Sequence, residues 1–237
     1  MKSMVFGATG FTGREVVRQL AESGHQVVAH VRPGSSSLER WQSTFQDWGA
    51  GVDTSEWDDQ SIAAAVANHR PELVFSLLGT TRKRAKAEGL EAGSAYQRID
   101  YGLTAMAIRA AAAVEPKPLF VYLSSIGVKD GVKNRYLAAR ARAEAELRNS
   151  GLPFVIARPS FITGNRDESR PGETIAAAVG NSLLALAGAF GARRTRDRYR
   201  SMDNRQLAAA LLAAAIDPEQ HGRVLAGDDL QALIAAS

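Results

Sequence analysis

Cysteine is absent from this chain of 237 residues, and its absence removes several kinds of chemistry at once. Disulfide frameworks, thiolate metal sites and cysteine nucleophiles are all excluded. Histidine is scarce, with four copies, and none of them has the spacing of a metal-binding pair. We therefore predict no metal site in this protein.

Long apolar runs are also missing. The longest apolar stretch extends from Ser182 to Phe190, which is far too short to cross a bilayer. The first residues run directly into Gly7 and lack the apolar segment of a signal peptide. These two features predict a soluble cytoplasmic protein without a membrane partner.

No strong excess of one charge is present, since 29 Lys and Arg stand against 25 Asp and Glu, for a net charge of +4. A mildly basic balance suits anionic ligands but does not identify nucleic acid as a partner. The densest charge run comprises Arg193, Arg194, Arg196, Arg198 and Arg200, with Tyr199 as its one interleaved aromatic residue. Because no nucleic-acid-binding module accompanies it, this run predicts a solvated or interface segment, and no nucleic-acid partner is expected.

What is present is an alternation of short apolar runs and helical patterns. Five runs rich in Val, Leu, Ile and Phe are predicted as buried parallel strands: Lys2–Phe6, Gln26–Val31, Leu73–Leu78, Leu119–Ser124 and Phe154–Arg158. A further short strand is expected between Gln46 and Val52. The helical patterns cover Gly13–Glu22, Asp58–Asn68, Ser94–Val114 and Asn134–Asn149. This order predicts an α/β protein with a Rossmann-type, doubly wound parallel sheet.

After Pro159 the pattern changes. A loop rich in Gly, Pro, Asn and Asp is followed by predicted helices at Thr174–Ala187 and Asp203–Ile216. We expect one domain over residues 1–237, with a dinucleotide-binding core at 1–160. Residues 161–237 are expected to form a small substrate-side extension, which is not independent and covers the carboxyl edge of the sheet, where ligands bind in open α/β folds.

Three glycines follow the first predicted strand at intervals of three residues. Gly7, Gly10 and Gly13 stand between that strand and the first predicted helix. The first glycine permits a tight turn, the second lets the backbone approach a pyrophosphate, and the third lets the helix pack close to the strand. The helix N-terminus then presents N–H groups to the phosphates. This context favours a dinucleotide-binding loop over an unliganded β–α turn.

The second predicted strand is followed by Arg32 rather than by an acidic residue. An Asp or Glu there would bind the ribose 2′-hydroxyl of NAD and repel a 2′-phosphate, whereas arginine attracts that phosphate. The sequence therefore favours NADP over NAD, with a solvated surface arginine as the alternative interpretation.

A candidate proton-transfer set follows the strand at Leu119–Ser124. Ser125 comes directly after that strand, and Tyr136 and Arg140 lie one turn apart on the same face of the next predicted helix. The tyrosine hydroxyl would exchange a proton with a substrate carbonyl or alcohol while the serine hydroxyl holds the substrate oxygen. A nearby cation would stabilise tyrosinate, whose ordinary pKa is near 10.

Together with the glycine loop, these residues resemble the short-chain dehydrogenase/reductase superfamily, whose usual motif is Tyr-x-x-x-Lys. Within it, the similarity is to the atypical, Tat-interacting-protein-like oxidoreductases. The matching stretches are Gly7–Gly13, Leu78–Arg82, Ile99-Asp100-Tyr101, Leu123-Ser124-Ser125, Tyr136-Leu137, Arg158-Pro159 and Glu168–Glu173. They extend over about three quarters of the chain.

The resemblance implies a Rossmann-type sheet and an NADP-type cofactor. It also implies that Ser125 and Tyr136 lie at the reaction centre, and that the residues just after Arg158-Pro159 meet the nicotinamide. The full set of expected cofactor contacts is Gly7, Thr9, Gly10, Phe11, Thr12, Gly13, Arg32, Asp53, Leu78, Gly79, Thr80, Ser124, Tyr136, Arg140, Pro159 and Phe161.

Arg140 departs from the superfamily pattern because it stands where lysine is usual. Arginine keeps the positive charge but cannot release a proton, and its planar fork does not replace a compact ammonium. One interpretation gives Arg140 a catalytic or cofactor-contacting role, and the other pairs it with Glu144 along the helix.

Two functions are consistent with these residues. The first is an NADP-dependent oxidoreductase that acts on a small carbonyl or alcohol substrate. The second is an NADP(H)-binding redox sensor that does little chemistry and signals through a protein partner. A monomer and a homodimer are both consistent with the sequence.

Overall fold

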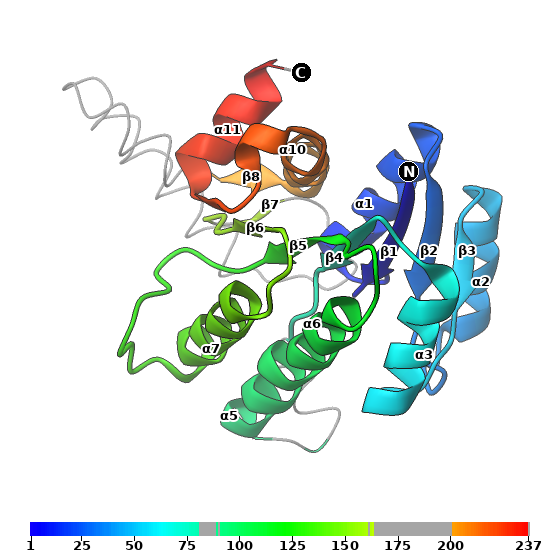
Figure 1. Cartoon of the computed structure of the whole chain (residues 1–237), viewed down its shortest axis with the longest axis horizontal. Coiled ribbons are helices and arrows are strands. Elements are labelled where there is room, and N and C mark those ends of the chain that lie inside the picture. The colour runs from blue at the N-terminus through cyan, green and yellow to red at the C-terminus, as the bar shows by residue number, and fades with distance from the viewer. Residues whose placement is uncertain (81–88, 90, 161, 164–200, 237) are drawn as a thin grey trace.

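The computed structural model describes residues 1–80, 89, 91–160, 162–163 and 201–236. Its central feature is a seven-stranded sheet in the order β3-β2-β1-β4-β5-β6-β9 (Figure 1), in which every neighbouring pair is parallel. The strands are β1 (Lys2–Phe6), β2 (Gln26–His30), β3 (Gly51–Asp53), β4 (Leu73–Ser76), β5 (Leu119–Leu123), β6 (Phe154–Ala157) and β9 (Val224–Leu225). This arrangement confirms the predicted Rossmann-type α/β fold.

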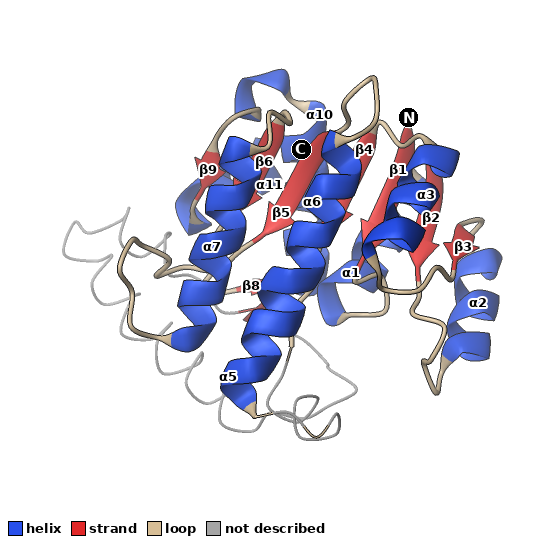
Figure 2. Cartoon of the chain, turned by 60° about the horizontal axis from the view of Figure 1, so that its bottom comes forward, coloured by secondary structure: helices blue, strands red, loops and turns tan. Residues whose placement is uncertain are grey.

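Helices cover both faces of the sheet, because successive strand residues alternate between two hydrophobic cores. Val5 packs into one core with residues of α1 (Phe11–Glu22), α2 (Leu38–Asp47), α10 (Asn204–Ile216) and α11 (Gly227–Ala236). Met4 and Phe6 pack into the other, with residues of α3 (Asp59–His69), α6 (Thr104–Ala112) and α7 (Arg135–Asn149). Figure 2 shows α6 and α7 on one side of the sheet and α10 and α11 on the other. Strands buried on both faces require the nearly continuous apolar runs seen in the sequence.

The long helix predicted at Ser94–Val114 is divided in the structure. It consists of α5 (Ala92–Ala95), a π-helical segment η1 (Tyr96–Leu103) and α6. A π-helical turn carries one extra residue and rotates the side chains that follow it. The sequence did not predict helices α2 and α11 or the two-residue strands β9, β7 (Ile162–Thr163) and β8 (Met202–Asp203). The predicted helix at Thr174–Ala187 lies outside the described residues.

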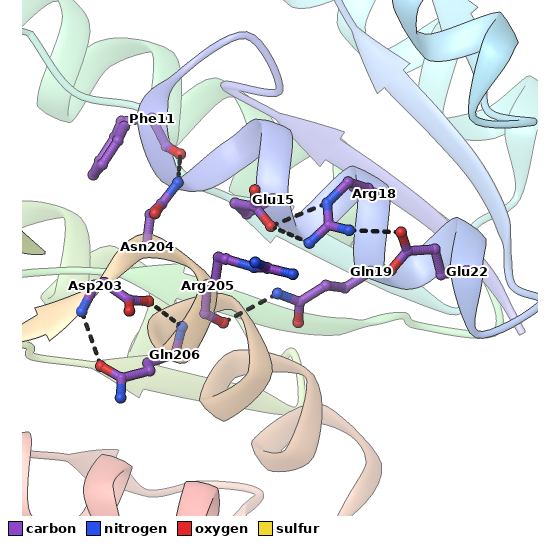
Figure 3. Close-up of polar contacts among 9 residues, drawn as sticks. All are labelled: Phe11, Glu15, Arg18, Gln19, Glu22, Asp203, Asn204, Arg205 and Gln206. Carbon is purple, nitrogen blue, oxygen red and sulfur yellow. Dashed lines mark hydrogen bonds and ion pairs between the residues drawn. The ribbon is translucent and has the colours of Figure 1, made fainter. Parts of the chain in front are cut away.

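The sequence predicted that the C-terminal part covers the carboxyl edge of the sheet. In the structure it also contributes to the core. A two-stranded sheet of β7 and β8 leads into α10, which packs against α1. The side chain of Asn204 donates to the carbonyl of Phe11 at 3.1 Å, and that of Gln19 donates to the carbonyl of Arg205 at 3.0 Å (Figure 3). With β9 added to the sheet, the C-terminal part forms one layer of the core.

A capping box begins α10, and its loss provides a test of this layer. Asp203 Oδ1 accepts from the backbone N–H of Gln206 at 2.8 Å, while Gln206 Oε1 accepts from the backbone N–H of Asp203 at 3.1 Å. We expect Asp203→Ala to lower the free energy of unfolding by about 1 kcal/mol, measured by urea denaturation. Asp203→Asn keeps a capping oxygen and should leave the midpoint nearly unchanged. Equal midpoints for both variants would contradict a stabilising cap.

Candidate functional site

The candidate site lies at the carboxyl edge of the sheet, beside β1. From β1 the strand order proceeds in opposite directions to β2 and to β4, so this is the topological switch point where open α/β sheets bind ligands. Two loops meet there, one after β1 and one after β4. A Cβ atom on Gly7 would lie 2.7 Å from the carbonyl carbon and oxygen of Leu77, so only glycine allows this approach.

The loop after β1 has the geometry of the phosphate cradle that the sequence predicts. Gly7 adopts a φ of +81°, and its carbonyl accepts from the N–H of Gly10 at 2.9 Å. A Cβ on Gly13 would lie 2.1 Å from the same carbonyl oxygen. Gly10 is the N-cap of α1, and no described side chain caps this helix end. Backbone amides at an uncapped helix N-terminus form a site for anions, and a Cβ on Gly7 or Gly13 would deform it.

The predicted adenosine side of the site lies where β2 and β3 end. Arg32 is exposed just beyond β2, and the N–H of Val31 donates to the carbonyl of Asp53 at 2.9 Å. The Asp53 carboxylate accepts from the N–H of Ser55 at 3.0 Å and from His69 Nε2 at 2.9 Å. Burial by itself raises the pKa of Asp53, but these hydrogen bonds outweigh it, so the pKa lies below its ordinary value. Its carboxylate therefore already has partners within the protein.

Arg140 lies at the centre of a buried polar cluster. Its guanidinium donates to Asp100 Oδ1 at 2.9 Å, to the carbonyl of Leu78 at 3.0 Å and to the carbonyl of Leu123. The Tyr122 hydroxyl accepts a longer hydrogen bond of 3.4 Å. Burial alone lowers the pKa of Arg140, but its interactions with Tyr122, Tyr136 and Asp100 outweigh this effect and raise it. The guanidinium is thus permanently charged and only 5% exposed.

These contacts replace the sequence-based alternative in which Arg140 pairs with Glu144. Asp100, on η1, also accepts from the backbone N–H of Thr80 at 3.2 Å. A Cβ atom on Gly79 would lie 2.6 Å from Arg140 Nη2. The buried pair of Arg140 and Asp100 therefore fixes the predicted cofactor-side loop, Leu78–Thr80, to η1 and α7.

Glu144 instead forms a second buried cluster, and sequence reasoning missed its contacts with Ser124 and Arg158. Ser124 Oγ donates to it at 2.6 Å, Arg158 binds both carboxylate oxygens at 2.8 and 2.6 Å, and Arg148 adds a contact at 2.8 Å. Burial raises the pKa of Glu144, but hydrogen bonds from Arg158 and Ser124 outweigh that effect and lower it. This ionised carboxylate joins α7 to the ends of β5 and β6. The Ser124 hydroxyl therefore donates its proton to Glu144 within the protein.

Tyr136 and Ser125 remain the half-buried hydroxyls of the predicted reaction centre. The Tyr136 ring lies 5.3 Å from the Arg140 guanidinium and packs edge-on against Tyr96 at 5.4 Å. Ser125 Oγ makes one weak local contact, of 3.3 Å, with the carbonyl of Ile126. No hydrogen bond joins the two hydroxyls across the described part of the site.

The predicted nicotinamide-side backbone is partly visible. Pro159 is buried, and its carbonyl accepts from the N–H of Ile126 at 3.0 Å, which joins the chain after β6 to the chain after β5. Phe161 and the stretch Glu168–Glu173 lie outside the described residues.

A Rossmann sheet with a glycine cradle at its switch point defines a dinucleotide-binding protein. The chain belongs to the NAD(P)H-binding family, whose model matches residues 7–182. It is 28% identical to the mitochondrial protein FMP52 of Coccidioides immitis, over 95% of this chain and 93% of that one. It is 30% identical to subunit 9 of the NADH dehydrogenase [ubiquinone] 1 alpha subcomplex of Arabidopsis thaliana, over 69% of this chain and 39% of that one.

A solved structure shares the fold over its full length. A putative NAD-dependent epimerase/dehydratase from Bacillus halodurans superposes with a TM-score of 0.70 at 20% identity, with both chains covered completely. The resemblance to the short-chain dehydrogenase/reductase superfamily is therefore confirmed for family and fold. The narrower resemblance to Tat-interacting-protein-like oxidoreductases stays a prediction.

The comparisons correct one expectation. The prediction of a cytoplasmic location is wrong, since these curated relatives are named as mitochondrial proteins. The prediction depended on the missing apolar leader, and an apolar leader is a mark of secretion rather than of organelle import. Within the described residues, no helix is long and apolar enough to span a membrane.

Replacing Arg140 by lysine tests whether the guanidinium is a structural centre. A lysine has one nitrogen and cannot reach Asp100 and both backbone carbonyls together, so buried acceptors lose their donors. We expect Arg140→Lys to lower the free energy of unfolding by about 3 kcal/mol, measured by urea denaturation. Arg142→Lys, exposed on the same helix, should change it by less than about 0.5 kcal/mol. Unchanged stability together with higher turnover in Arg140→Lys would show that Arg140 merely replaces the usual lysine.

Proposed function

We propose that this protein is an NADP-dependent oxidoreductase of the atypical short-chain dehydrogenase/reductase type, acting on a small carbonyl or alcohol substrate. The observation that carries the proposal is the position of Tyr136. Its half-buried ring lies over a permanently charged guanidinium, on the helix whose buried arginine holds the Leu78–Thr80 loop. Membership of the NAD(P)H-binding family supports the cofactor at the coarser level.

A dinucleotide held by the Gly7–Gly13 loop would supply the hydride to the carbonyl carbon, or accept it from the alcohol carbon in the reverse direction. In the reducing direction the Tyr136 hydroxyl gives its proton to the substrate oxygen as the carbonyl becomes an alcohol, and solvent returns a proton to the tyrosinate. Ser125 donates a hydrogen bond to the same substrate oxygen. The positive charge of Arg140, 5.3 Å from the Tyr136 ring, stabilises the tyrosinate without giving up a proton.

The proposed cofactor contacts fall into three groups. The cradle of Gly7–Gly13 receives the pyrophosphate, Arg32 receives the 2′-phosphate of the adenosine ribose, and the Leu78–Thr80 backbone lines the cofactor crevice. Pro159 and Phe161 are assigned to the nicotinamide side by resemblance to the superfamily. Among the remaining expected contacts, Ser124, Asp53 and Arg140 have side chains engaged within the protein, so we assign them supporting roles.

A second function is favoured by the burial of Arg140. Its guanidinium is occupied by Asp100 and by two backbone carbonyls, so less of it is available to a cofactor ribose than of a superfamily lysine. A protein of this kind would bind NADP(H), catalyse little hydride transfer and signal through a protein partner. The Arabidopsis relative, named as a subunit of a larger assembly, supports a protein partner.

Removal of the Tyr136 hydroxyl separates the two functions. For an oxidoreductase, we expect Tyr136→Phe to reduce kcat by about 10²- to 10⁴-fold and to leave the dinucleotide Kd within a factor of two, because only the proton donor is lost. Steady-state assays following NADPH absorbance over a panel of small aldehydes and ketones provide the measurement. Tyr96→Phe removes the neighbouring hydroxyl and is the matched control. A wild-type protein that binds NADPH but turns over none of the panel would favour the sensor, and equal activity in Tyr136→Phe would remove Tyr136 from the mechanism.

The preference for NADP is tested at Arg32. Loss of a charge-assisted hydrogen bond to a phosphate costs about 1.5–3 kcal/mol, so we expect Arg32→Ala to weaken NADPH binding by roughly 10- to 100-fold. Binding of NADH, which lacks the 2′-phosphate, should change little. Calorimetric titration of both dinucleotides gives the ratio, and Lys117→Ala, at the opposite edge of the sheet, is the control. A wild-type protein that prefers NADH would overturn the assignment.

A further inference from the structure

A groove of about 710 Å³ runs between α5 and η1 on one side and the start of α7 on the other. Its walls include Ser94, Gln97 and Arg98 from the first side and Lys133 and Arg135 from the second. Figure 2 shows these helix ends beyond the carboxyl ends of the strands, at the edge of the sheet that holds the candidate site. The groove is therefore separate from the glycine cradle but shares its edge.

The lining of this groove is strongly one-sided in charge. Among the described residues, Arg98, Lys133 and Arg135 line it together, and no carboxylate does. Within the described part of the chain, none of the three forms an ion pair with an acidic side chain. Cations on the neighbouring helical surface behave differently, because Arg109 binds both Asp59 and Glu146.

The polar groups beside these cations complete a set of donors. Ser94 and Gln97 lie one turn apart, and Gln97 Oε1 accepts from Arg142 at 2.5 Å. That contact uses the amide oxygen of Gln97 and leaves its NH₂ group as a donor. Two guanidinium groups, an ammonium, an amide and a hydroxyl together match the acceptor-rich geometry of a phosphate or carboxylate.

Gly93 contributes to this arrangement by what it lacks. A Cβ atom there would lie 2.6 Å from Arg135 Nη1 and 3.0 Å from Arg135 Cδ. The absence of a side chain at this position lets the Arg135 guanidinium lie against α5. Arg135 thus bridges the two walls of the groove instead of extending into solvent.

The groove is adjacent to Tyr136 from both sides. Arg135 directly precedes Tyr136 on α7, while Tyr96, between the groove residues Ser94 and Gln97, packs against the Tyr136 ring at 5.4 Å. The groove therefore borders the turn of α7 that carries Tyr136. The groove is thus placed to select a substrate by its charge.

We propose that this groove binds the anionic group of the substrate, a phosphate monoester or a carboxylate, and that Arg98, Lys133 and Arg135 determine this specificity. The proposal rests on the proposed oxidoreductase function, since it names the substrate class of that site. It predicts a carbonyl compound with an anionic group a few bonds away from the reacting carbon.

Matched substrate pairs test the proposal in the full-length protein loaded with NADPH. D-glyceraldehyde 3-phosphate is compared with D-glyceraldehyde, and succinic semialdehyde with butanal. We expect KM to be at least roughly tenfold lower for the charged member of one pair, as charge-assisted hydrogen bonds imply. Whichever pair shows the larger ratio identifies phosphate or carboxylate as the preferred anion. Equal KM values within both pairs would overturn the proposal.

Variants locate the effect in the groove. The triple variant Arg98→Ala, Lys133→Ala, Arg135→Ala should raise KM for the charged substrate at least roughly tenfold, while KM for the uncharged partner and the Kd for NADPH stay unchanged. Gly93→Ala should raise the same KM without removing any charge, because the new Cβ displaces Arg135. Lys129→Ala, in the same β5–α7 loop but outside the groove, is the control for charge, and Gly34→Ala, whose Cβ would meet nothing within 4 Å, is the control for the glycine substitution.

Direct binding separates failure of this proposal from failure of the oxidoreductase function. Calorimetric titration of inorganic phosphate and of succinate needs no turnover. Binding that the triple variant abolishes, in a protein inactive toward every carbonyl, would support the groove and contradict the oxidoreductase. Turnover with equal KM values for charged and uncharged substrates would support the oxidoreductase and contradict the groove. A triple variant with unchanged KM values but an altered particle mass in solution would mark the groove as a contact between copies of this chain, and would overturn the proposal.

Discussion

The buried ion pair between Arg140 and Asp100 is the interaction on which the candidate site depends. Removal of a charge from water is costly, and a buried pair is tolerated only when further hydrogen bonds satisfy both partners. Here Arg140 donates to the carbonyls of Leu78 and Leu123, and Asp100 accepts from the N–H of Thr80. Loss of either partner would leave an uncompensated charge, at a cost of about 3–5 kcal/mol. The residues at the carboxyl ends of β4 and β5 are thus held in position before any ligand binds.

A second cluster, around Glu144, repeats this construction one turn further along α7. Arg158 and Ser124 bring the ends of β6 and β5 to the same carboxylate. Helix α7 therefore carries two opposite charges into the interior, one for each pair of neighbouring strands. Pre-organised loops of this kind lower the entropy that a bound molecule must lose. The half-buried Tyr136 stands at the outer end of the same helix, so its position is fixed by the same contacts.

Much of the fold could be predicted from periodicity and spacing. The five strands of four or five residues follow from local patterns. Helix α2 was missed although Leu38, Trp41 and Phe45 recur at helical spacing, because the strand expected between Gln46 and Val52 was placed across its C-terminal end. Strand β9 has two residues, too few for any pattern. The glycine cradle of the site could be predicted, because its glycines are close together in the sequence.

The buried partners of the site were not readable, because they join residues far apart in the sequence. Arg140 was assigned to Glu144 by the i, i+4 rule, whereas its acidic partner stands 40 residues earlier, on η1. No helical spacing rule reaches across elements. The one available signal was the stretch Ile99-Asp100-Tyr101, which matched the superfamily but carried no stated partner. A buried acid on one helix facing a buried base on another is visible only once the packing is known.

The hydrogen bond from Asn204 to the carbonyl of Phe11 has a consequence for communication within the molecule. Phe11 is the first residue of α1, so its peptide group belongs to the turn beside the glycine cradle. The same peptide group also binds the start of α10. Any ligand that orders the first turn of α1 also stabilises the packing of α10 against α1. By thermodynamic reciprocity, whatever loosens α10 weakens the grip on that ligand to the same extent. Phe11 and Asn204 are 193 residues apart in the sequence, and this hydrogen bond couples ligand binding at α1 to the packing of α10.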